Sequence, residues 1–233
     1  MKEHIYSIPL TEALEQNCGC ILCILEKKLE GQAIDYFLGA SMMEPDSREV
    51  TNKKGFCRRH MTGLFNKKNR LSLALTLETH IQELEKKVCV HKKAGVFSKE
   101  STAVLTASSL SETARSCALC DKLNKEMDSA AGNLSYMWSV EKGFREMFES
   151  SEGLCLEHTA LAIEMCDKEL GGKKKDEYIS MLIKKQKEKL SKLYEDLHGF
   201  TLSFDYRNAN KELTQNEKES VENAVKHLTK YME

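Results

Sequence analysis

The sequence predicts an all-α protein. Only two prolines occur among 233 residues, and proline is the residue that helix interiors exclude. Leu, Glu, Lys, Ala and Met, which favour helices, are abundant. Apolar residues also recur every three or four positions, which is the spacing of one helix face. These observations indicate helices packed around a shared apolar core.

In the first half of the chain, five helical segments are expected. A short helix begins at Pro9, and a long one runs from Ile21 through Met43 until Pro45 interrupts it. A brief helix between Ser47 and Gly55 follows, and FCRRHMTGLF begins another. The clearest pattern comes after Asn69, where apolar residues are spaced by three or four: Leu73, Leu77, Ile81, Leu84 and Val88.

The second half repeats this order of elements. Residues 95–116 are rich in Ser and Thr and are interpreted as a connector. A helix from Ala118 is expected to turn near Gly132, before a helix that contains Trp138. LCLEHTALAIEMCDKEL and a long helix to residue 197 follow. A terminal helix is expected to dock through an apolar stripe: Val221, Ala224, Val225, Leu228 and Tyr231.

A duplicated motif divides the chain. Cys20-x-x-Cys23 is followed after 33 residues by Cys57-x-x-His60, and Cys117-x-x-Cys120 is followed after 34 residues by Cys155-x-x-His158. Gly55 and Gly153 also occupy corresponding positions in the two copies. The repeat predicts two similar helical units at 1–100 and 101–199, with a C-terminal segment and docking helix at 200–233, forming one pseudo-symmetric domain.

These eight residues are the predicted metal ligands. Side chains at positions i and i+3 of a helix lie about 5–6 Å apart, so two of them can reach one ion. Two such pairs complete the tetrahedron that zinc prefers. We expect each repeat to form its own Cys3His site, with Cys20, Cys23, Cys57 and His60 in one and Cys117, Cys120, Cys155 and His158 in the other. Two zinc ions per chain follow.

Three alternatives stay open at this point. The pairs could be core cysteines, because a free Cys behaves as a small hydrophobe. An iron–sulfur cluster is a second possibility, although three Cys and one His are more typical of zinc. The third is thiol–disulfide chemistry at one CxxC, although the βαβ pattern of thioredoxin-like proteins is absent from the sequence.

Other polar and aromatic residues are interpreted more plainly. Cys18 is treated as a spare thiol, and Cys89 and Cys166 as core residues. A di-iron bundle needs a pair of Glu-x-x-His motifs, and the sequence does not provide this pair for His80. Three more histidines are expected at the surface or at helix ends: His91, His198 and His227. Core packing is preferred to a ligand groove for Trp138.

Charge and hydropathy restrict location and partners. The formal net charge is −1, and acidic residues interleave the lysine runs, so nucleic acid is not an expected partner. No stretch has about 18 uncharged apolar residues, which is the length that a membrane span needs. Nine cysteines without a secretory signal favour the reducing cytoplasm.

The motifs CILC, GFCRRH, CALC and GLCLEH, with FDYRN at 204–208, resemble an uncharacterised family of Gram-positive anaerobic bacteria, a domain of unknown function. The resemblance implies a soluble, intracellular, metal-binding protein and supplies no activity. From the residues we expect structural zinc, no catalytic constellation, and an interaction or scaffold role with a protein partner. The alternative is a thiol-based redox or metal sensor that releases zinc on oxidation.

Overall fold

The structure, a computed structural model, describes residues 7–16, 19–88, 101–208 and 212–229. Within these ranges the chain forms eleven α-helices, two 3₁₀ helices and no strand, which confirms the all-α prediction. The first elements are α1 (Ser7–Glu15), α2 (Ile21–Leu38), η1 (Ala40–Met43), α3 (Pro45–Lys54), α4 (Arg58–Asn66) and α5 (Arg70–Val88). The later ones are α6 (Thr102–Arg115), α7 (Ala118–Val140), α8 (Lys142–Ser150), α9 (Leu156–Glu169), α10 (Gly172–Leu202), η2 (Tyr206–Asn208) and α11 (Gln215–Thr229).

The helices form two compact units. The terminal unit comprises Met1–Lys27 and Glu126–Glu233, and the central unit comprises Lys28–Lys125. The boundaries fall inside α2 and α7, so each of these two helices contributes residues to both units. The compact units therefore have other bounds than the sequence repeats, and the division at residues 100 and 199 stays a prediction.

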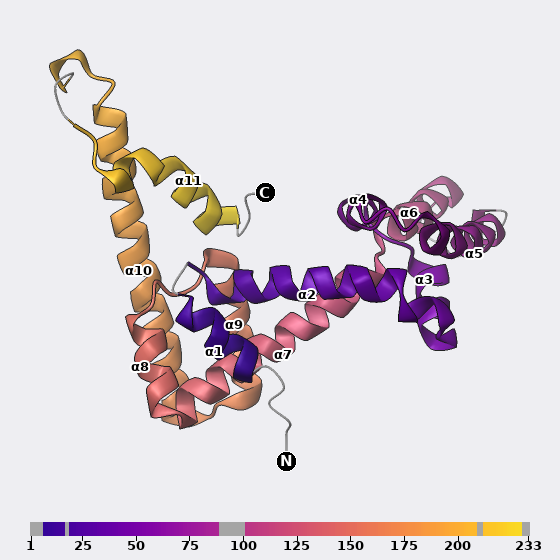
Figure 1. Ribbon diagram of the computed structural model, residues 1–233, viewed down its shortest axis with the longest axis horizontal. Coiled ribbons are helices and arrows are strands. Elements are labelled where there is room, and N and C mark those ends of the chain that lie inside the picture. The colour runs from indigo at the N-terminus through magenta and orange to yellow at the C-terminus, as the bar shows by residue number, and fades with distance from the viewer. Residues whose placement is uncertain (1–6, 17–18, 89–100, 209–211, 230–233) are drawn as a thin grey trace. The chain divides into compact units, whose positions relative to one another are not determined.

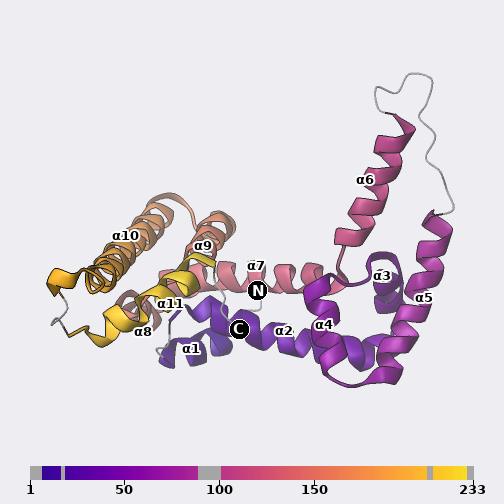
Figure 2. The same cartoon turned by 90° about the horizontal axis from the view of Figure 1, so that it is seen from above.

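In the central unit, α3 lies beside α5 (Figure 2). Arg48 of α3 connects them by donating hydrogen bonds to Thr79 Oγ1 at 2.6 Å and to the Leu75 carbonyl at 2.9 Å. The rings of Phe37 and Phe56 meet edge to face with their centroids 5.3 Å apart. This contact packs the segment that leads into α4 against the end of α2.

In the terminal unit, aromatic side chains fill the core. Trp138 is 1% exposed, and its ring lies 5.0 Å from that of Tyr178. The Trp138 indole nitrogen donates to Glu149 Oε1 at 3.0 Å, which satisfies its one polar group. The prediction that Trp138 packs in the core is confirmed.

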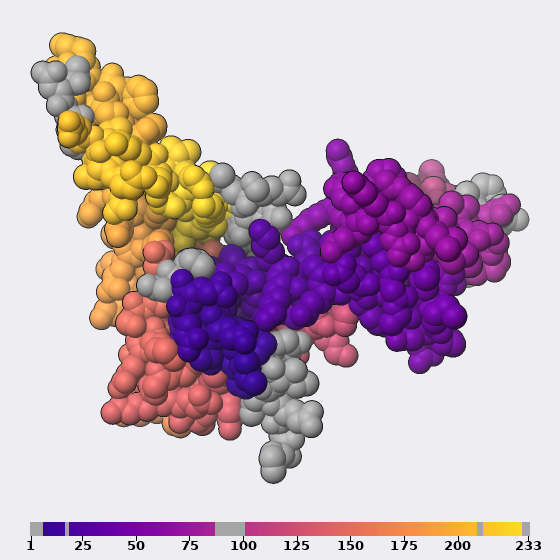
Figure 3. Space-filling view, in the orientation of Figure 1, coloured from indigo at the N-terminus to yellow at the C-terminus, as the bar shows by residue number. Residues whose placement is uncertain are grey.

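The terminal helix α11 packs against α10, which it meets at an angle in Figure 1, and it also contacts α9 (Figures 1 and 3). Its buried face differs from the predicted stripe, because Val221, Val225 and Leu228 are exposed. Ala224 of that stripe is buried, together with the polar residues Glu217, Ser220 and His227, while Tyr231 lies outside the described residues. Glu217 accepts the Thr214 backbone N–H at 2.8 Å, while Thr214 Oγ1 accepts from the Glu217 backbone N–H, which is the capping box that starts the helix.

Two predictions about irregular segments were wrong. Residues 102–115 of the expected connector form helix α6, which has no buried residue. Ser101 caps it by accepting from the Val104 N–H, and Thr106 and Thr113 bond to carbonyls one turn back, so the hydroxyls are compatible with a helix. The expected turn at Gly132 is also absent from α7, which is continuous from Ala118 to Val140.

The uninterrupted α7 has a packing explanation. Gly132 lies against the side chain of Glu169, where an added Cβ would come within 3.4 Å. Its neighbours Ala130, Ala131 and Leu134 are fully buried. Tertiary burial therefore outweighs the weak helix propensity of Gly-Asn.

The long helices also differ from membrane spans. None of them, over the described ranges, combines the length and the apolar character that crossing a membrane requires.

Candidate metal centres

The structure gathers the eight predicted ligands into two clusters of four. The terminal cluster contains Cys20, Cys23, Cys155 and His158, and the central cluster contains Cys57, His60, Cys117 and Cys120. In each cluster the four candidate ligand atoms lie within 4.8 Å of one another. Each cluster lies wholly within the compact unit of the same name, and each could hold one metal ion.

The predicted pairing within each repeat was wrong, because each cluster combines the CxxC of one repeat with the CxxH of the other. Helix length explains the exchange. Helix α2 starts just after Cys20 and has 18 residues, so it carries the chain about 27 Å away from its own CxxC. The next long element, α3, has 10 residues and spans about 15 Å, which is too short to bring Cys57 back.

In the second repeat, too, a long helix separates the CxxC from the CxxH. Helix α7 has 23 residues and carries the chain about 35 Å from its start beside Cys117. Helix α8 has nine residues, or about 14 Å, before Cys155. In both repeats the CxxC and the CxxH are thus at opposite ends of a long helix, and each needs the other repeat to complete four ligands.

The CxxH half-sites share a local design. Gly55 and Gly153 have positive φ angles of 60° and 83°, which turn the chain immediately before the ligands. Cys57 and Cys155 are then the N-cap residues of α4 and α9. Their sulfur atoms therefore lie beside the free backbone N–H groups of a first helical turn, where negative charge is stabilised.

In the terminal cluster one ring nitrogen faces all three sulfur atoms. His158 Nδ1 lies 3.4 Å from Cys20 Sγ, 3.3 Å from Cys23 Sγ and 3.4 Å from Cys155 Sγ. The sulfur atoms of Cys23 and Cys155 are 3.7 Å apart. His158 is 1% exposed and Cys155 is buried, whereas Cys20 and Cys23 are partly exposed, so water reaches the cluster from the CxxC side.

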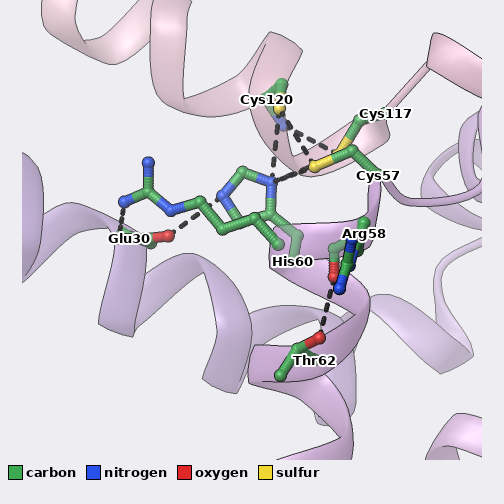
Figure 4. Close-up of polar contacts among 8 residues, drawn as sticks. Glu30, Cys57, Arg58, His60, Thr62, Cys117 and Cys120 are labelled. Atoms are coloured by element: carbon green, nitrogen blue, oxygen red, sulfur yellow. Dashed lines mark hydrogen bonds and ion pairs between the residues drawn. The ribbon is translucent and has the colours of Figure 1, made fainter. Parts of the chain in front are cut away.

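The central cluster repeats this arrangement (Figure 4). His60 Nδ1 lies 3.3 Å from each of the sulfur atoms of Cys57, Cys117 and Cys120. The sulfur atoms of Cys57 and Cys120 are 3.8 Å apart. His60 is 3% exposed, which is close to the burial of its counterpart.

Two glutamates were missed by the sequence analysis. Glu30 Oε1 lies 3.1 Å from Nε2 of His60, as Figure 4 shows, and Glu26 Oε2 lies 3.4 Å from Nε2 of His158. Both are in α2, three and seven positions after Cys23, a spacing that keeps side chains near one helix face. Glutamates at such spacings are common on helices, so the spacing alone does not single out these two.

The electrostatics of the terminal cluster favour a cation. Burial works to lower the pKa of His158, but hydrogen bonds with Cys155, Cys20 and Glu26 outweigh it and raise this pKa to about 11. Hydrogen bonds with Cys20 and Cys23 hold the pKa of Cys155 far below its ordinary value. Without a metal, the negative charge of the Cys155 thiolate thus stabilises the protonated ring of His158. A bound metal ion would supply the positive charge in place of that proton.

The central cluster shows the same division of charge among its thiols. Burial works to raise the pKa of Cys57, but backbone N–H donation from His60 and hydrogen bonds with Cys120 and Cys117 lower it overall. The pKa of Cys120 is raised, first by burial and then by its hydrogen bond with Cys117. Cys57 is therefore the thiol of this pair that ionises first.

Different neighbours hold the two CxxH loops. Gln186 Nε2 donates to the Leu154 carbonyl at 2.7 Å and to Thr159 Oγ1 at 2.6 Å. His227 Nε2 donates to Gln186 Oε1 at 3.0 Å, so α11 is linked to the loop beside Cys155. In the central unit, Ser116 Oγ donates to the Lys54 carbonyl at 2.7 Å.

The remaining Cys and His residues have varied outcomes. Cys166 is fully buried, as predicted. His227 lies in the last turn of α11, one of the two places expected, but its ring is buried rather than at the surface and bonds to Gln186. His80 accompanies the central loop, where its ring fills the space beside Gly55. Cys18, Cys89 and His91 lie outside the described residues.

The chain belongs to a family of unknown function, DUF6062, whose model matches residues 1–233. The resemblance to an uncharacterised family is thereby confirmed, while the bacterial origin stays a prediction. No curated protein and no solved structure gave a significant match to the chain.

Proposed function

We propose that this protein is a zinc-binding helical protein with two structural zinc ions, and that it serves as an interaction or scaffold module in the cytoplasm. The observation that carries the proposal is the presence of two four-residue clusters, each with three sulfur atoms around one imidazole nitrogen. Thiolate and imidazole ligands together suit zinc better than they suit magnesium or calcium.

The distances within the clusters support a tetrahedral ion. With zinc–sulfur bonds of about 2.3 Å and zinc–nitrogen bonds of about 2.0 Å, the edges of a tetrahedron are about 3.8 Å between sulfurs and about 3.5 Å between sulfur and nitrogen. The sulfur–sulfur distances are 3.7 Å for Cys23–Cys155 and 3.8 Å for Cys57–Cys120, and the sulfur–nitrogen distances are 3.3–3.4 Å. A small shift would accommodate zinc in either cluster.

The same distances argue against an iron–sulfur cluster. The protein ligands of such a cluster bind different iron atoms, which holds the ligand sulfurs further apart than the ligands of a single ion. Here all four ligand atoms of each cluster lie within 4.8 Å, which suits one ion at the centre.

A structural role follows from the ligand count. A catalytic zinc has three protein ligands and keeps one position for water or substrate, whereas four protein ligands fill the tetrahedron. Each cluster offers four. Each ion would then join the start of α2 or α7 to the start of α9 or α4, respectively, and hold the two repeats together.

The interaction role draws support from α11. Val221, Val225 and Leu228 are 48%, 38% and 56% exposed on a helix that buries Glu217, Ser220 and His227. Replacing these three residues by Lys should abolish capture of a specific partner from cell extract while α11 stays docked. Identical captured proteins with both versions, or no partner with either, would argue against this role.

The metal proposal has a direct test. Native mass spectrometry with elemental analysis of the full chain should find two zinc ions per molecule. A chain that retains one ion or none after purification in zinc-containing buffer would contradict the double-site model. Iron in place of zinc would retain the sites but change the metal.

A zinc-releasing redox sensor is the second candidate, and the central cluster favours it. Cys57 and Cys120 are both partly exposed and their sulfur atoms are 3.8 Å apart. Hydrogen peroxide would take two electrons from the two thiolates, giving one disulfide and, with two protons, two waters, while zinc leaves. Zinc retained under peroxide that oxidises other thiols would exclude this function.

A further inference from the structure

Helix α2 provides a carboxylate to each metal cluster. Glu26 faces His158 within the terminal unit, and Glu30 faces His60 within the central unit. Each glutamate side chain is only 13% exposed. A carboxylate with so little access to water is stable only when its oxygen atoms are bonded to protein donors.

The second repeat has no such carboxylates. The CxxC at residue 117 lies 97 positions after the CxxC at residue 20, so Leu123 corresponds to Glu26 and Met127 to Glu30. Leu123 and Met127 are both 4% exposed and belong to the core. Although the ligands are duplicated, one helix of one repeat supplies both acidic partners.

Both carboxylate oxygens of Glu30, the glutamate of the central cluster, have a partner. Glu30 Oε1 faces His60 Nε2, and its other oxygen accepts from Arg59 at 2.7 Å. The residue that corresponds to Arg59 in the second repeat is Glu157, which carries the opposite charge. Arg59 thereby fixes the Glu30 carboxylate against the ring.

A carboxylate beside a metal-binding imidazole orients the ring. A histidine that binds a metal through Nδ1 has its proton on Nε2, and a carboxylate at Nε2 fixes that tautomer and the ring orientation. It also makes the imidazole a stronger donor to the metal. In both clusters Nδ1 faces the sulfur atoms and Nε2 faces the glutamate.

We propose that Glu26 and Glu30 are positioning residues for metal retention, Glu26 for the terminal cluster and Glu30 for the central cluster. The inference rests on the proposed metal binding and adds that α2 orients both histidines. Each glutamate acts on its own cluster, so its removal weakens one site selectively.

The test uses the full chain loaded with zinc and a competing chelator. The retention of each ion is followed by alkylation of individual cysteines, read by peptide mass spectrometry. In Glu30→Gln, Cys57, Cys117 and Cys120 should become reactive at a free-zinc concentration about 10–100-fold higher than in the unaltered chain. The cysteines of the terminal cluster should keep their protection, and Glu26→Gln should give the reverse pattern.

Asp35→Asn is the matched control, because Asp35 is an exposed carboxylate on α2 that pairs with Lys67. It should change the protection of neither cluster. Glu26→Leu and Glu30→Met form a second pair of variants, which place on α2 the residues that the second repeat has. They should reproduce the site-selective loss while circular dichroism of the zinc-loaded protein stays unchanged.

Equal loss at both clusters in either variant, or no loss at either, would overturn the inference. The unaltered chain separates this failure from that of the proposed function. If it binds two zinc ions and the glutamate variants retain both ions as tightly, only the positioning role is wrong. If the unaltered chain binds no metal, both proposals fail.

Discussion

The terminal and central clusters contain the same residue types, three Cys and one His, but have different supports. In the terminal cluster the CxxH loop is held by buried Gln186, which is itself bonded to His227 of α11. In the central cluster the loop is held by Ser116, and the histidine partner Glu30 is shared with Arg59. The two sets of cluster residues are alike because a tetrahedral ion would accept few types of donor at nearly fixed distances. The loop supports can differ because any nearby donor satisfies a backbone carbonyl.

The largest expected effect comes from removing both ions. Structural zinc contributes about 10–16 kcal/mol of apparent binding free energy in small domains, so chelation should unfold or loosen both units. Circular dichroism and thermal unfolding before and after chelation measure the change. Zinc should restore the signal and magnesium should not. An unchanged melting temperature would show that packing alone supports both clusters.

The cross-repeat pairing is tested by removing one CxxC. In Cys20→Ser/Cys23→Ser the terminal cluster keeps two of its four ligands, so one zinc should be lost. Cys155 should then become reactive toward an alkylating reagent, while Cys57 stays protected. Peptide mass spectrometry reads both residues in the same sample.

The reciprocal variant is Cys117→Ser/Cys120→Ser, which should expose Cys57 and leave Cys155 protected. Pairing within each repeat predicts the opposite result for both variants. Protection of Cys155 combined with exposure of Cys57 in the first variant would therefore disprove the arrangement described above.

The two loop glycines should differ in their tolerance of alanine. Gly55 has φ 60° and ψ −148°, a region that only glycine adopts readily, and an added Cβ would lie 2.3 Å from the His80 ring. Strain of about 1–3 kcal/mol and overpacking of about 1–3 kcal/mol are expected for Gly55→Ala. Gly153→Ala should cost less, about 1–2 kcal/mol, because the nearest atom is 3.4 Å away on the flexible Lys185 side chain.

Urea unfolding of the zinc-loaded variants measures this difference in the free energy of unfolding. Gly143→Ala serves as a control, because an added Cβ at Gly143 meets nothing within 4 Å. Equal losses at Gly55 and Gly153 would mean that the His80 ring moves aside freely.

The smallest effects concern the donors that hold the two loops. Gln186→Ala removes the hydrogen bonds that Gln186 makes with the buried Leu154 carbonyl and with His227. The free energy of unfolding should therefore fall by about 1–3 kcal/mol. Ser116→Ala removes a bond near the surface and should cost about 0.5–1 kcal/mol. Hydrogen exchange of α11 should rise only in Gln186→Ala, and a rise in both variants would contradict the separate supports.

Local signals explain which parts of the fold were predictable. The spacing of apolar residues located most helices, because an amphipathic helix records its buried face in its own sequence. It failed at residues 102–115, where no residue of α6 is buried, and at Gly132, where packing against Glu169 keeps α7 straight. It also misplaced most of the buried face of α11, where the buried His227 bonds to Gln186 far away in the chain.

The ligand residues were predictable for a similar reason, and their partners were not. Cys and His at a spacing of three, found four times, indicate a metal by residue type and count alone. Glu26 and Glu30 have no such signature, since glutamates on a helix are common and only contact with a ring distinguishes these two.

Residue type, count and local spacing were enough to predict the helical class, the duplicated set of Cys and His residues and the metal chemistry that such a set favours. Tertiary structure alone decided which CxxC meets which CxxH. The physical reason is helix length: α2 and α7 have 18 and 23 residues, and each separates the two halves of its own motif along the chain. Completing four ligands therefore required an exchange between the repeats.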